Sequence, residues 1–396
     1  MYKAKQGCII GHFLSNNNNE YNFQNFMNEE ELKYRLALHL LPGIGPVLAR
    51  ALMSYCGSVE NIFLKKKGQL EKIPGIGSER AKLIQKKDLF EKAEAEIIFM
   101  KKHGIKPLFY LDKDYPSRLK NCEDAPLMLF NKGNVNLNSD RMIAIVGTRF
   151  ITSYGKEATE KLIEELAKYK TVIVSGLAYG VDIHAHKYAI NNNIPTIGVV
   201  AHGLDRLYPT EHKAIAEKML LNGAIISEYV SKTNPDRENF PARNRIVAGM
   251  CDAVIVIESA EKGGALITAD LANDYNRDVF ALPGRTTDHF SRGCHQLIRK
   301  NKAMLFESAE HIAEIMNWDN PKETNKHKAQ KQLDLFITLN EDEKKLVKIL
   351  QSDKIIGIDS LALKTNFPVS KVSAILLNLE FAGLLKSLPG KMYRLE

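Results

Sequence analysis

The 396-residue chain has few cysteines and no long apolar run, and these two shortages already exclude several classes of protein. The five cysteines, Cys8, Cys56, Cys122, Cys251 and Cys294, stand singly along the chain. Metal-binding cysteines usually come in closely spaced pairs and a disulfide framework needs an even set, so neither is expected, and a reducing cytoplasm is the expected location. No apolar run approaches the roughly 18–20 residues of a membrane-spanning helix, which excludes an integral membrane protein.

Two glycine-rich nucleotide signatures are also absent. The apolar run Met142–Val146 is followed by Gly147-Thr148-Arg149, which lacks the G-x-G-x-x-G spacing of a dinucleotide-binding turn. No Gly-Lys-Ser/Thr sequence follows it, so it is not a Walker A phosphate loop either. These absences argue against NAD and ATP as ligands, and no cofactor is predicted.

The composition that remains is that of a globular protein with a mild basic bias. Hydrophobic residues make up 44% of the chain and charged residues 26%. The 55 Lys and Arg against 47 Asp and Glu give a formal net charge of +8, which is compatible with a polyanionic partner. The length favours two or three domains.

The first 28 residues differ from the rest of the chain. They contain the run Asn16–Asn19 and show neither helical nor strand periodicity, so we expect a disordered leader. Met27 directly precedes Asn28 and three glutamates, a pattern that favours the start of a helix. We therefore hypothesise that the natural chain starts at Met27.

Residues 29–105 are predicted to be helical and contain an internal repeat. The segment 41–45 (Leu-Pro-Gly-Ile-Gly) is echoed by 73–77 (Ile-Pro-Gly-Ile-Gly), and a helical pattern follows each, over 47–53 and 79–85. Glycines in such turns allow backbone N–H groups to approach a ligand closely. The pattern resembles a paired helix-hairpin-helix module, which either contacts DNA phosphates or only packs its two hairpins together.

Residues 106–315 combine a connector with a region that alternates strand and helix signals. Apolar runs of this length indicate strands buried on both faces, as in a parallel sheet. The sequence therefore predicts an α/β fold with a doubly wound, Rossmann-like parallel sheet. The predicted strands are 142–146, 171–174, 196–200, 224–227, 253–257 and 279–282.

Two further segments complete the chain. Residues 316–339 are polar and lysine-rich, and are predicted to be a linker. Residues 340–396 show three helical patterns followed by a hairpin around Pro389-Gly390, which is typical of a winged helix. The third helical pattern, 370–381, is mostly apolar, so it is either core, a protein contact or, as in other winged helices, a duplex-binding element.

Parallel strands bring their carboxyl ends to one edge of the sheet, where open α/β folds bind ligands. The segments after successive predicted strands share a set of groups: arginines, hydroxyls and aromatic rings. They are Arg149, Arg243 and Arg245; Thr148, Ser175 and Thr268; and Phe150, Tyr179, Tyr208 and Phe240. Guanidinium groups bind phosphate and aromatic rings stack on unpaired bases, so this edge is predicted to bind single-stranded nucleic acid.

From about residue 29 onward the chain resembles the DprA/Smf family of DNA-processing proteins. The motifs that carry the resemblance are 115–116, 146–149 (Val-Gly-Thr-Arg), 175–182 with His186, 203–205 with Tyr208-Pro209, 227–228, 240–245 (Phe-Pro-Ala-Arg-Asn-Arg) and 264–269. The resemblance implies a Rossmann-like domain that binds single-stranded DNA without enzymatic turnover. It also implies a homodimer that loads RecA recombinase onto incoming strands in natural transformation.

The resemblance also assigns roles by position. Arg149 corresponds to an arginine placed at DNA phosphates, and Arg243 and Arg245 to a second arginine segment. Tyr179 stands where many members have arginine, and His212 and His295 stand where asparagine is common, which affects details of DNA contact. The predicted DNA-binding residues are Gly147, Thr148, Arg149, Ser175, Gly176, Ala178, Tyr179, Gly180, Arg243, Asn244, Arg245, Gly264 and Thr268.

The main alternative is a nucleotide-binding enzyme on a related fold. The segment 263–270 faintly resembles the P-G-G-x-G-T-x-x-E loop of nucleotide phosphoribohydrolases. Lys262 stands in place of the proline, Leu266 in place of the third glycine and Asp270 in place of the glutamate. The acidic side chain is therefore shorter by one methylene group, and the turn lacks one of its glycines. A binding protein is therefore favoured over an enzyme.

The triplet Asp182, His184 and His186 has the residue types of a metal site. On a helix Asp182 and His186 are i,i+4 neighbours, whereas His184 points elsewhere. We therefore expect a helix cap at Asp182 and a structural His186, with no metal.

Overall fold

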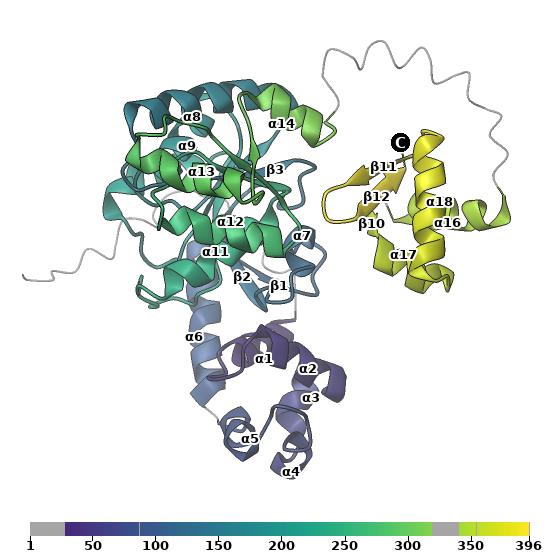
Figure 1. The fold of residues 1–396 in the computed structure, drawn as a ribbon. Helices are drawn as coiled ribbons and strands as arrows, with labels where there is room; N and C mark the ends of the chain where they lie inside the picture. Colours follow the sequence, from purple (N-terminus) through teal and green to yellow (C-terminus); the bar gives the residue numbers. More distant parts are fainter. Residues whose placement is uncertain (1–27, 87, 319–339, 354, 396) are drawn as a thin grey trace, which may run out of the picture.

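The computed structural model describes residues 28–86, 88–318, 340–353 and 355–395. Within them an N-terminal group of helices leads into a nine-stranded sheet covered by helices, and a domain with a three-stranded sheet follows (Figure 1). The described helices include none that is both long and apolar enough to cross a lipid bilayer. The predicted leader, with the hypothesised start at Met27, and most of the predicted linker 316–339 lie outside the described residues.

The N-terminal helices form around the predicted repeat. Ile44 and Ile76, the central residues of the two repeated segments, are both buried. Arg80 joins the two turns, because its Nε donates to the carbonyl of Gly43 (3.0 Å) and its Nη1 to that of Gly75 (2.7 Å). The repeat therefore packs as a unit, and its contact with DNA stays a prediction. The helices are α1 (Glu29–His39), α2 (Pro46–Cys56), α3 (Val59–Leu64), α4 (Lys67–Leu70), α5 (Ser78–Ile84) and α6 (Asp88–His103).

The large sheet has the predicted doubly wound topology, with strand order β1-β2-β6-β5-β4-β3-β7-β8-β9. From β6 to β9 neighbouring strands run parallel, as predicted. All six predicted strands lie in this parallel part, and the connector, where no strand was predicted, adds β1 and β2 in antiparallel pairing beside β6. The strands are β1 (Lys106–Phe109), β2 (Met128–Gly133), β3 (Met142–Val146), β4 (Val172–Ser175), β5 (Thr196–Val199), β6 (Gly223–Ser227), β7 (Ala253–Val256), β8 (Asp278–Ala281) and β9 (Met304–Leu305).

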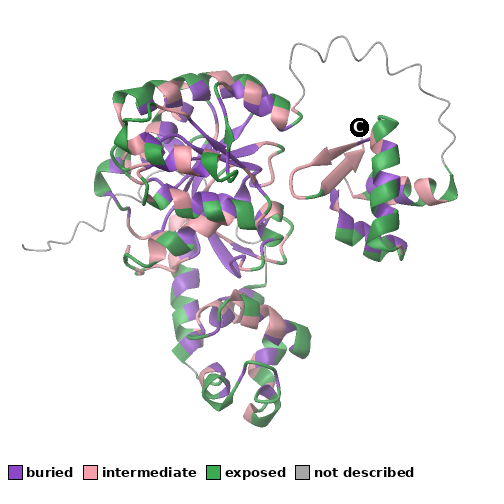
Figure 2. Ribbon diagram, in the orientation of Figure 1, coloured by how far each residue is buried: buried purple, intermediate pink, exposed green. Residues whose placement is uncertain are grey.

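Helices cover both faces of this sheet, whose strands are mostly buried (Figure 2). Side chains alternate along each strand, so successive residues belong to different layers. Ile143 and Ile145 of β3 pack under one layer, and Met142, Ala144 and Val146 under the other. Both faces are buried, which is why the strands are continuous apolar runs. One layer holds α8 (Ser153–Leu166), α9 (Val181–Asn191) and α14 (Ala309–Ile315); the other holds α7 (Ser117–Lys120), α11 (Asn239–Met250), α12 (Gly264–Asp274) and α13 (Arg292–Arg299).

The N-terminal helices pack against the connector side of the sheet. Leu36 and Leu52 belong to the same apolar cluster as Phe130 of β2 and Met219 of α10 (Lys213–Met219). Polar contacts reinforce this junction; Nη1 of Arg35, for example, lies 2.8 Å from Oδ1 of Asp112. The helical part and the sheet thus share one core. The remaining short helices are η2 (Ala167–Tyr169), η3 (Thr210–His212) and η4 (His289–Ser291).

The C-terminal domain has its own apolar core, which includes Leu346, Leu361 and Leu376. Its third helix begins after Pro368, which has no N–H to leave unsatisfied at that helix end. Helices followed by a hairpin confirm the predicted winged helix, to which the structure adds a short first strand. The elements are α16 (Glu341–Ser352), β10 (Ile356–Gly357), α17 (Ile358–Thr365), α18 (Val369–Phe381), β11 (Leu385–Leu388) and β12 (Met392–Leu395), with strand order β10-β12-β11.

A fully buried histidine makes the stability of the sheet domain sensitive to acid. Nδ1 of His186 in α9 lies 2.7 Å from Oγ1 of Thr196, whose hydroxyl reaches the carbonyl of Ile173. Nε2 of His186 has no hydrogen-bond partner among the described residues. A proton on Nε2 would therefore be buried without an acceptor, and burial lowers the pKa of His186 from 6.5 to about 3.

We expect this histidine to cost the folded state about 2 kcal/mol at pH 5 relative to pH 7.5. Its folded pKa lies below the unfolded value, so its stabilising effect is present above pH 6.5 and is lost as the pH falls toward 3. The measurement is urea unfolding of the wild type and of His186→Gln at both pH values. The variant should lose less stability between them; an identical pH-dependent loss in both proteins would contradict the assignment.

Candidate nucleic-acid interface

A cavity of about 970 Å³ opens where the order of the strands reverses, at the carboxyl ends of β3 and β7. Open α/β sheets bind ligands at such switch points, because the loops leaving the two neighbouring strands diverge there. The segments after β3, β4, β6, β7 and β8 all contribute to its wall. Eight of the predicted residues line it: Gly147, Thr148, Arg149, Ala178, Arg243, Asn244, Gly264 and Thr268.

The turn after β3 projects two side chains outward. The N–H of Thr148 donates to the carbonyl of Glu258 (2.7 Å), and the N–H of Phe150 donates to Oγ1 of Thr148 (3.1 Å). These bonds fix the backbone of the turn and leave Arg149 and Phe150 exposed at the cavity. The guanidinium of Arg149 lies 5.6 Å from the ring centre of Phe240, a cation–π contact that orients it.

The loop after β4 is shaped by Asp182 and by glycine. Oδ2 of Asp182 accepts from the N–H of Gly176 (3.1 Å) and, more weakly, from that of Ala178 (3.4 Å). Gly180 has a φ of +76°, and a Cβ there would lie 2.1 Å from the carbonyl oxygen of Thr148. Gly180 itself is the N-cap of α9, so the expectation that Asp182 caps this helix is wrong. Asp182 instead organises the preceding loop.

Arg243 is the most unusual side chain of the cavity, because it is charged and only 4% exposed. Its Nε has no hydrogen-bond partner among the described residues, and no described carboxylate forms an ion pair with it. Burial lowers the pKa of Arg243; Asp182 opposes this shift and the neighbouring Arg149 adds to it. A Cβ at Gly176 would lie 1.7 Å from Nη1 of Arg243, so only glycine leaves room for the guanidinium.

Five predicted residues do not line the cavity. Ser175 is buried and donates from Oγ to the carbonyl of Ile145 (2.6 Å). Arg245 turns away, forms an ion pair with Glu228 and donates to the carbonyl of Asp124 (2.5 Å). The ring of Tyr179 packs edge-on against that of His212, with ring centres 4.9 Å apart. Gly176 and Gly180 do not line the cavity, but they leave room for the Arg243 guanidinium and for the backbone of Thr148, respectively. Any direct DNA contact by these five stays a prediction.

Two lining residues of clear chemical character, Arg237 and Phe290, are not among the predicted site residues. Phe290 lies in the segment after β8. The carboxyl end of this last predicted strand also lies at the binding edge, so the position of the strand is the signal that could have identified Phe290. Arg237 lies three residues before Phe240 in a segment without regular structure, where no periodic pattern marks which side chains face a cavity.

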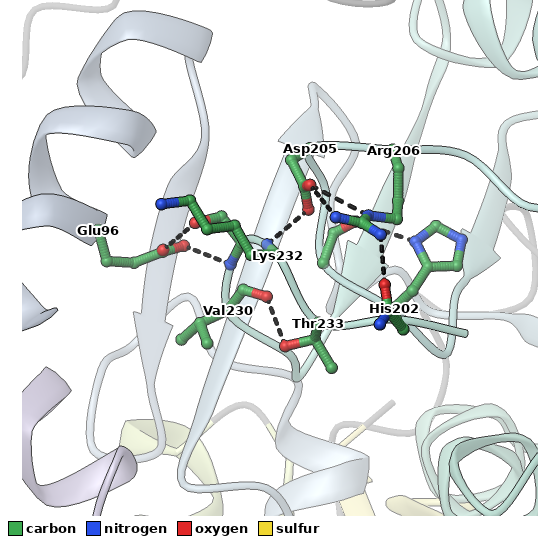
Figure 3. Close-up of polar contacts among 10 residues, drawn as sticks. Glu96, His202, Asp205, Arg206, Val230, Lys232 and Thr233 are labelled. Atoms are coloured by element: carbon green, nitrogen blue, oxygen red, sulfur yellow. Dashed lines mark hydrogen bonds and ion pairs between the residues drawn. The ribbon is translucent and has the colours of Figure 1, made fainter. Parts of the chain in front are cut away.

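Glu96 of α6 holds the segment after β6 that leads into one wall of this cavity, and Figure 3 shows its polar contacts. Glu96 of α6 accepts from the N–H and the Oγ of Ser231, at 3.0 and 2.5 Å, and burial raises the pKa of Glu96. Next to it, Oδ1 of Asp205 accepts from the N–H of Lys232 (2.8 Å). These bonds anchor the segment after β6, which continues to Pro235 and Arg237 in the cavity wall.

The three residues considered as metal ligands have separate partners. Asp182 accepts hydrogen bonds from backbone N–H groups of the loop before α9. Nε2 of His184 lies 3.0 Å from Oε1 of Glu160, and Nδ1 of His186 is hydrogen-bonded to the hydroxyl of Thr196. Within the described part of the chain no three His, Cys, Asp or Glu side chains are grouped as metal ligands would be.

Comparison with known proteins gives three family matches, which lie one after another between residues 36 and 391. Residues 106–317 match the family model of DNA recombination-mediator protein A. Residues 335–391 match the DprA winged helix domain, and residues 36–87 match the SAM-like helix-hairpin-helix tandem. The three matches coincide with the sheet domain, the C-terminal domain and the N-terminal repeat.

Individual relatives agree with these matches. The chain is 32% identical over 400 residues to protein Smf of Synechocystis sp., covering 93% of this chain and 100% of that protein. It is 41% identical over 205 residues to DNA processing protein DprA of Streptococcus pneumoniae, covering 52% of this chain and 72% of the relative. The solved structure of DprA from Streptococcus pneumoniae superimposes with a TM-score of 0.58 at 32% identity, over 73% of this chain and 98% of that one.

Proposed function

Because the chain belongs to the DprA/Smf family of DNA-processing proteins, we propose that it binds single-stranded DNA in the cavity at the carboxyl ends of β3 and β7. In this proposal Arg149 and Arg243 hold the phosphates of the strand. The protein acts by binding, without turnover of the DNA.

The observation that carries the proposal is the buried guanidinium of Arg243. A buried charge is costly unless it is paired, and Arg243 forms no ion pair within 4 Å of a described carboxylate. The carboxylate of Asp182 attracts it from a greater distance, whereas Arg149, which lines the same cavity, repels it. A phosphate diester would supply a further negative charge to both arginines. Guanidinium groups suit phosphate because they present several N–H donors in a fixed plane.

A helix N-terminus adds to this positive field. The N-cap of α12 is Gly263, which has no side-chain oxygen to occupy the free N–H groups of the first turn, and Gly263, Gly264 and Ala265 all line the cavity. Free N–H groups at the start of a helix favour a bound anion. This supports a role of Gly264 and Thr268 near a phosphate, as the sequence analysis predicted.

Two parts of the proposal rest on family membership alone. They are the homodimer and the delivery of the bound strand to RecA recombinase during natural transformation. The expected cytoplasmic location likewise stays a prediction.

The alternative of a phosphoribohydrolase-like enzyme receives no support from its expected acid. Asp270, the counterpart of the glutamate in that loop, forms an ion pair with Lys302 at 2.7 Å and does not line the cavity. We therefore retain the binding function.

The test is a fluorescence anisotropy titration of labelled oligo-dT at several salt concentrations between about 50 and 200 mM. Each phosphate neutralised on a single strand lowers log K by about 0.7 per unit of log salt, so contacts to Arg149 and Arg243 predict a slope of about −1.4 or steeper. No measurable binding at low salt, or an affinity that does not change with salt, would refute phosphate anchoring.

A further inference from the structure

We propose that Phe150 and Phe290 form a base-stacking site beside the arginines, so that the cavity selects DNA whose bases are unpaired. This inference rests on the proposed function and adds to it the feature of the ligand that is recognised. Both rings line the cavity, and they come from segments after different strands, β3 and β8.

Phe150 presents a ring to solvent from a fixed backbone. Its side chain is 75% exposed although a phenyl ring gains free energy by leaving water. The hydrogen bond from its N–H to Oγ1 of Thr148 holds the turn in place. The ring is therefore an apolar surface that is prepared for contact before a ligand arrives.

Phe290 supplies a second, anchored ring. Its carbonyl accepts from the N–H of Ser259 (2.6 Å), and its ring packs edge-on against His289 at 5.0 Å. The rings of Phe150 and Phe290 are nearly parallel, at an interplanar angle of 23°, with centres 6.5 Å apart. This separation lies near the upper end of the roughly 4.5–7 Å range of aromatic pairs, so the partner covers little of Phe150.

The position of Phe150 next to Arg149 explains how base and phosphate would be bound together. Adjacent residues of one exposed turn offer a cation for the backbone and a flat apolar face for the base. Base–aromatic stacking tolerates any sequence, because every base has a π face. In a duplex the bases are already stacked and paired, so their faces are not accessible to Phe150.

The experiment separates the base from the backbone. Affinities of the full-length protein are measured for oligo-dT and for an abasic oligonucleotide of the same length, and their ratio gives the contribution of the bases. Phe150→Ala should lower this ratio about fivefold or more, since losing one stacked base costs at least about 1 kcal/mol. Phe150→Tyr, which keeps the ring, should retain the wild-type ratio.

Phe381→Ala serves as the matched control, because it removes an 82% exposed phenyl ring from α18 of the C-terminal domain, and it should leave the ratio unchanged. An unchanged ratio in Phe150→Ala would overturn the stacking site even if oligo-dT binds with the expected salt dependence. Failure of the wild type to bind either oligonucleotide would instead refute the proposed function itself.

Discussion

Replacement of Arg149 by alanine is expected to weaken oligo-dT binding by about 10- to 150-fold, which corresponds to the roughly 1.5–3 kcal/mol of a lost charge-assisted hydrogen bond. Arg149 is exposed at the cavity and held by a cation–π contact with Phe240, so its removal should disturb the fold little. The measurement is an anisotropy titration at low salt, with the salt slope determined for the wild type and the variant. The slope should become shallower by about 0.7.

Arg299→Ala is the control for this variant, because it also removes one exposed positive charge but from the end of α13, outside the cavity wall. Its affinity should stay close to that of the wild type. If both variants lost affinity equally, general attraction by the basic chain rather than a defined site would account for binding.

The second prediction concerns stability: Arg118→Ala should lower the free energy of unfolding by about 3–5 kcal/mol, the cost of leaving a buried charge without its partner. Nε of Arg118 in α7 donates to Oδ1 of Asp252 (2.6 Å), and the other carboxylate oxygen accepts from the N–H of Met142 (2.8 Å). Burial raises the pKa of Asp252, and Arg118 opposes that shift. This pair joins the connector to the start of β3 and β7.

Urea unfolding of the variant measures the loss. The double variant Arg118→Ala with Asp252→Asn should recover part of it, because the amide removes the unpaired charge and its oxygen can still accept from Met142. A loss below about 1 kcal/mol in Arg118→Ala would show that the pair behaves like an exposed ion pair.

The parallel strands and the paired hairpins could be predicted from the sequence because their signals are local. A strand buried on both faces is a run of apolar residues, as in Met142–Val146, and a repeated turn such as 41–45 and 73–77 is visible by comparison within the chain. The antiparallel strands β1 and β2 could not be predicted in this way. Pro107 lies within β1, and polar Asn131 and Lys132 lie within β2, so neither segment has a continuous apolar pattern.

What makes β1 and β2 strands is their register with the rest of the sheet. Phe130 pairs with Ser227 of β6, a residue almost a hundred positions further along the chain. Glu96 is also far from its partner along the chain, because it accepts from Ser231 in the segment after β6. Contacts between such remote segments depend on the assembled fold and leave no periodic trace in either one.

The candidate site divides in the same way. The sequence by itself determined which chemical groups follow the strands, since parallel strands end at one edge whatever the details of packing. Only the tertiary structure decided that Arg243 enters the cavity while Arg245 pairs with Glu228. Both arginines lie in α11, where residues two positions apart point to different sides of the helix, and the start and rotation of that helix depend on its packing against the sheet.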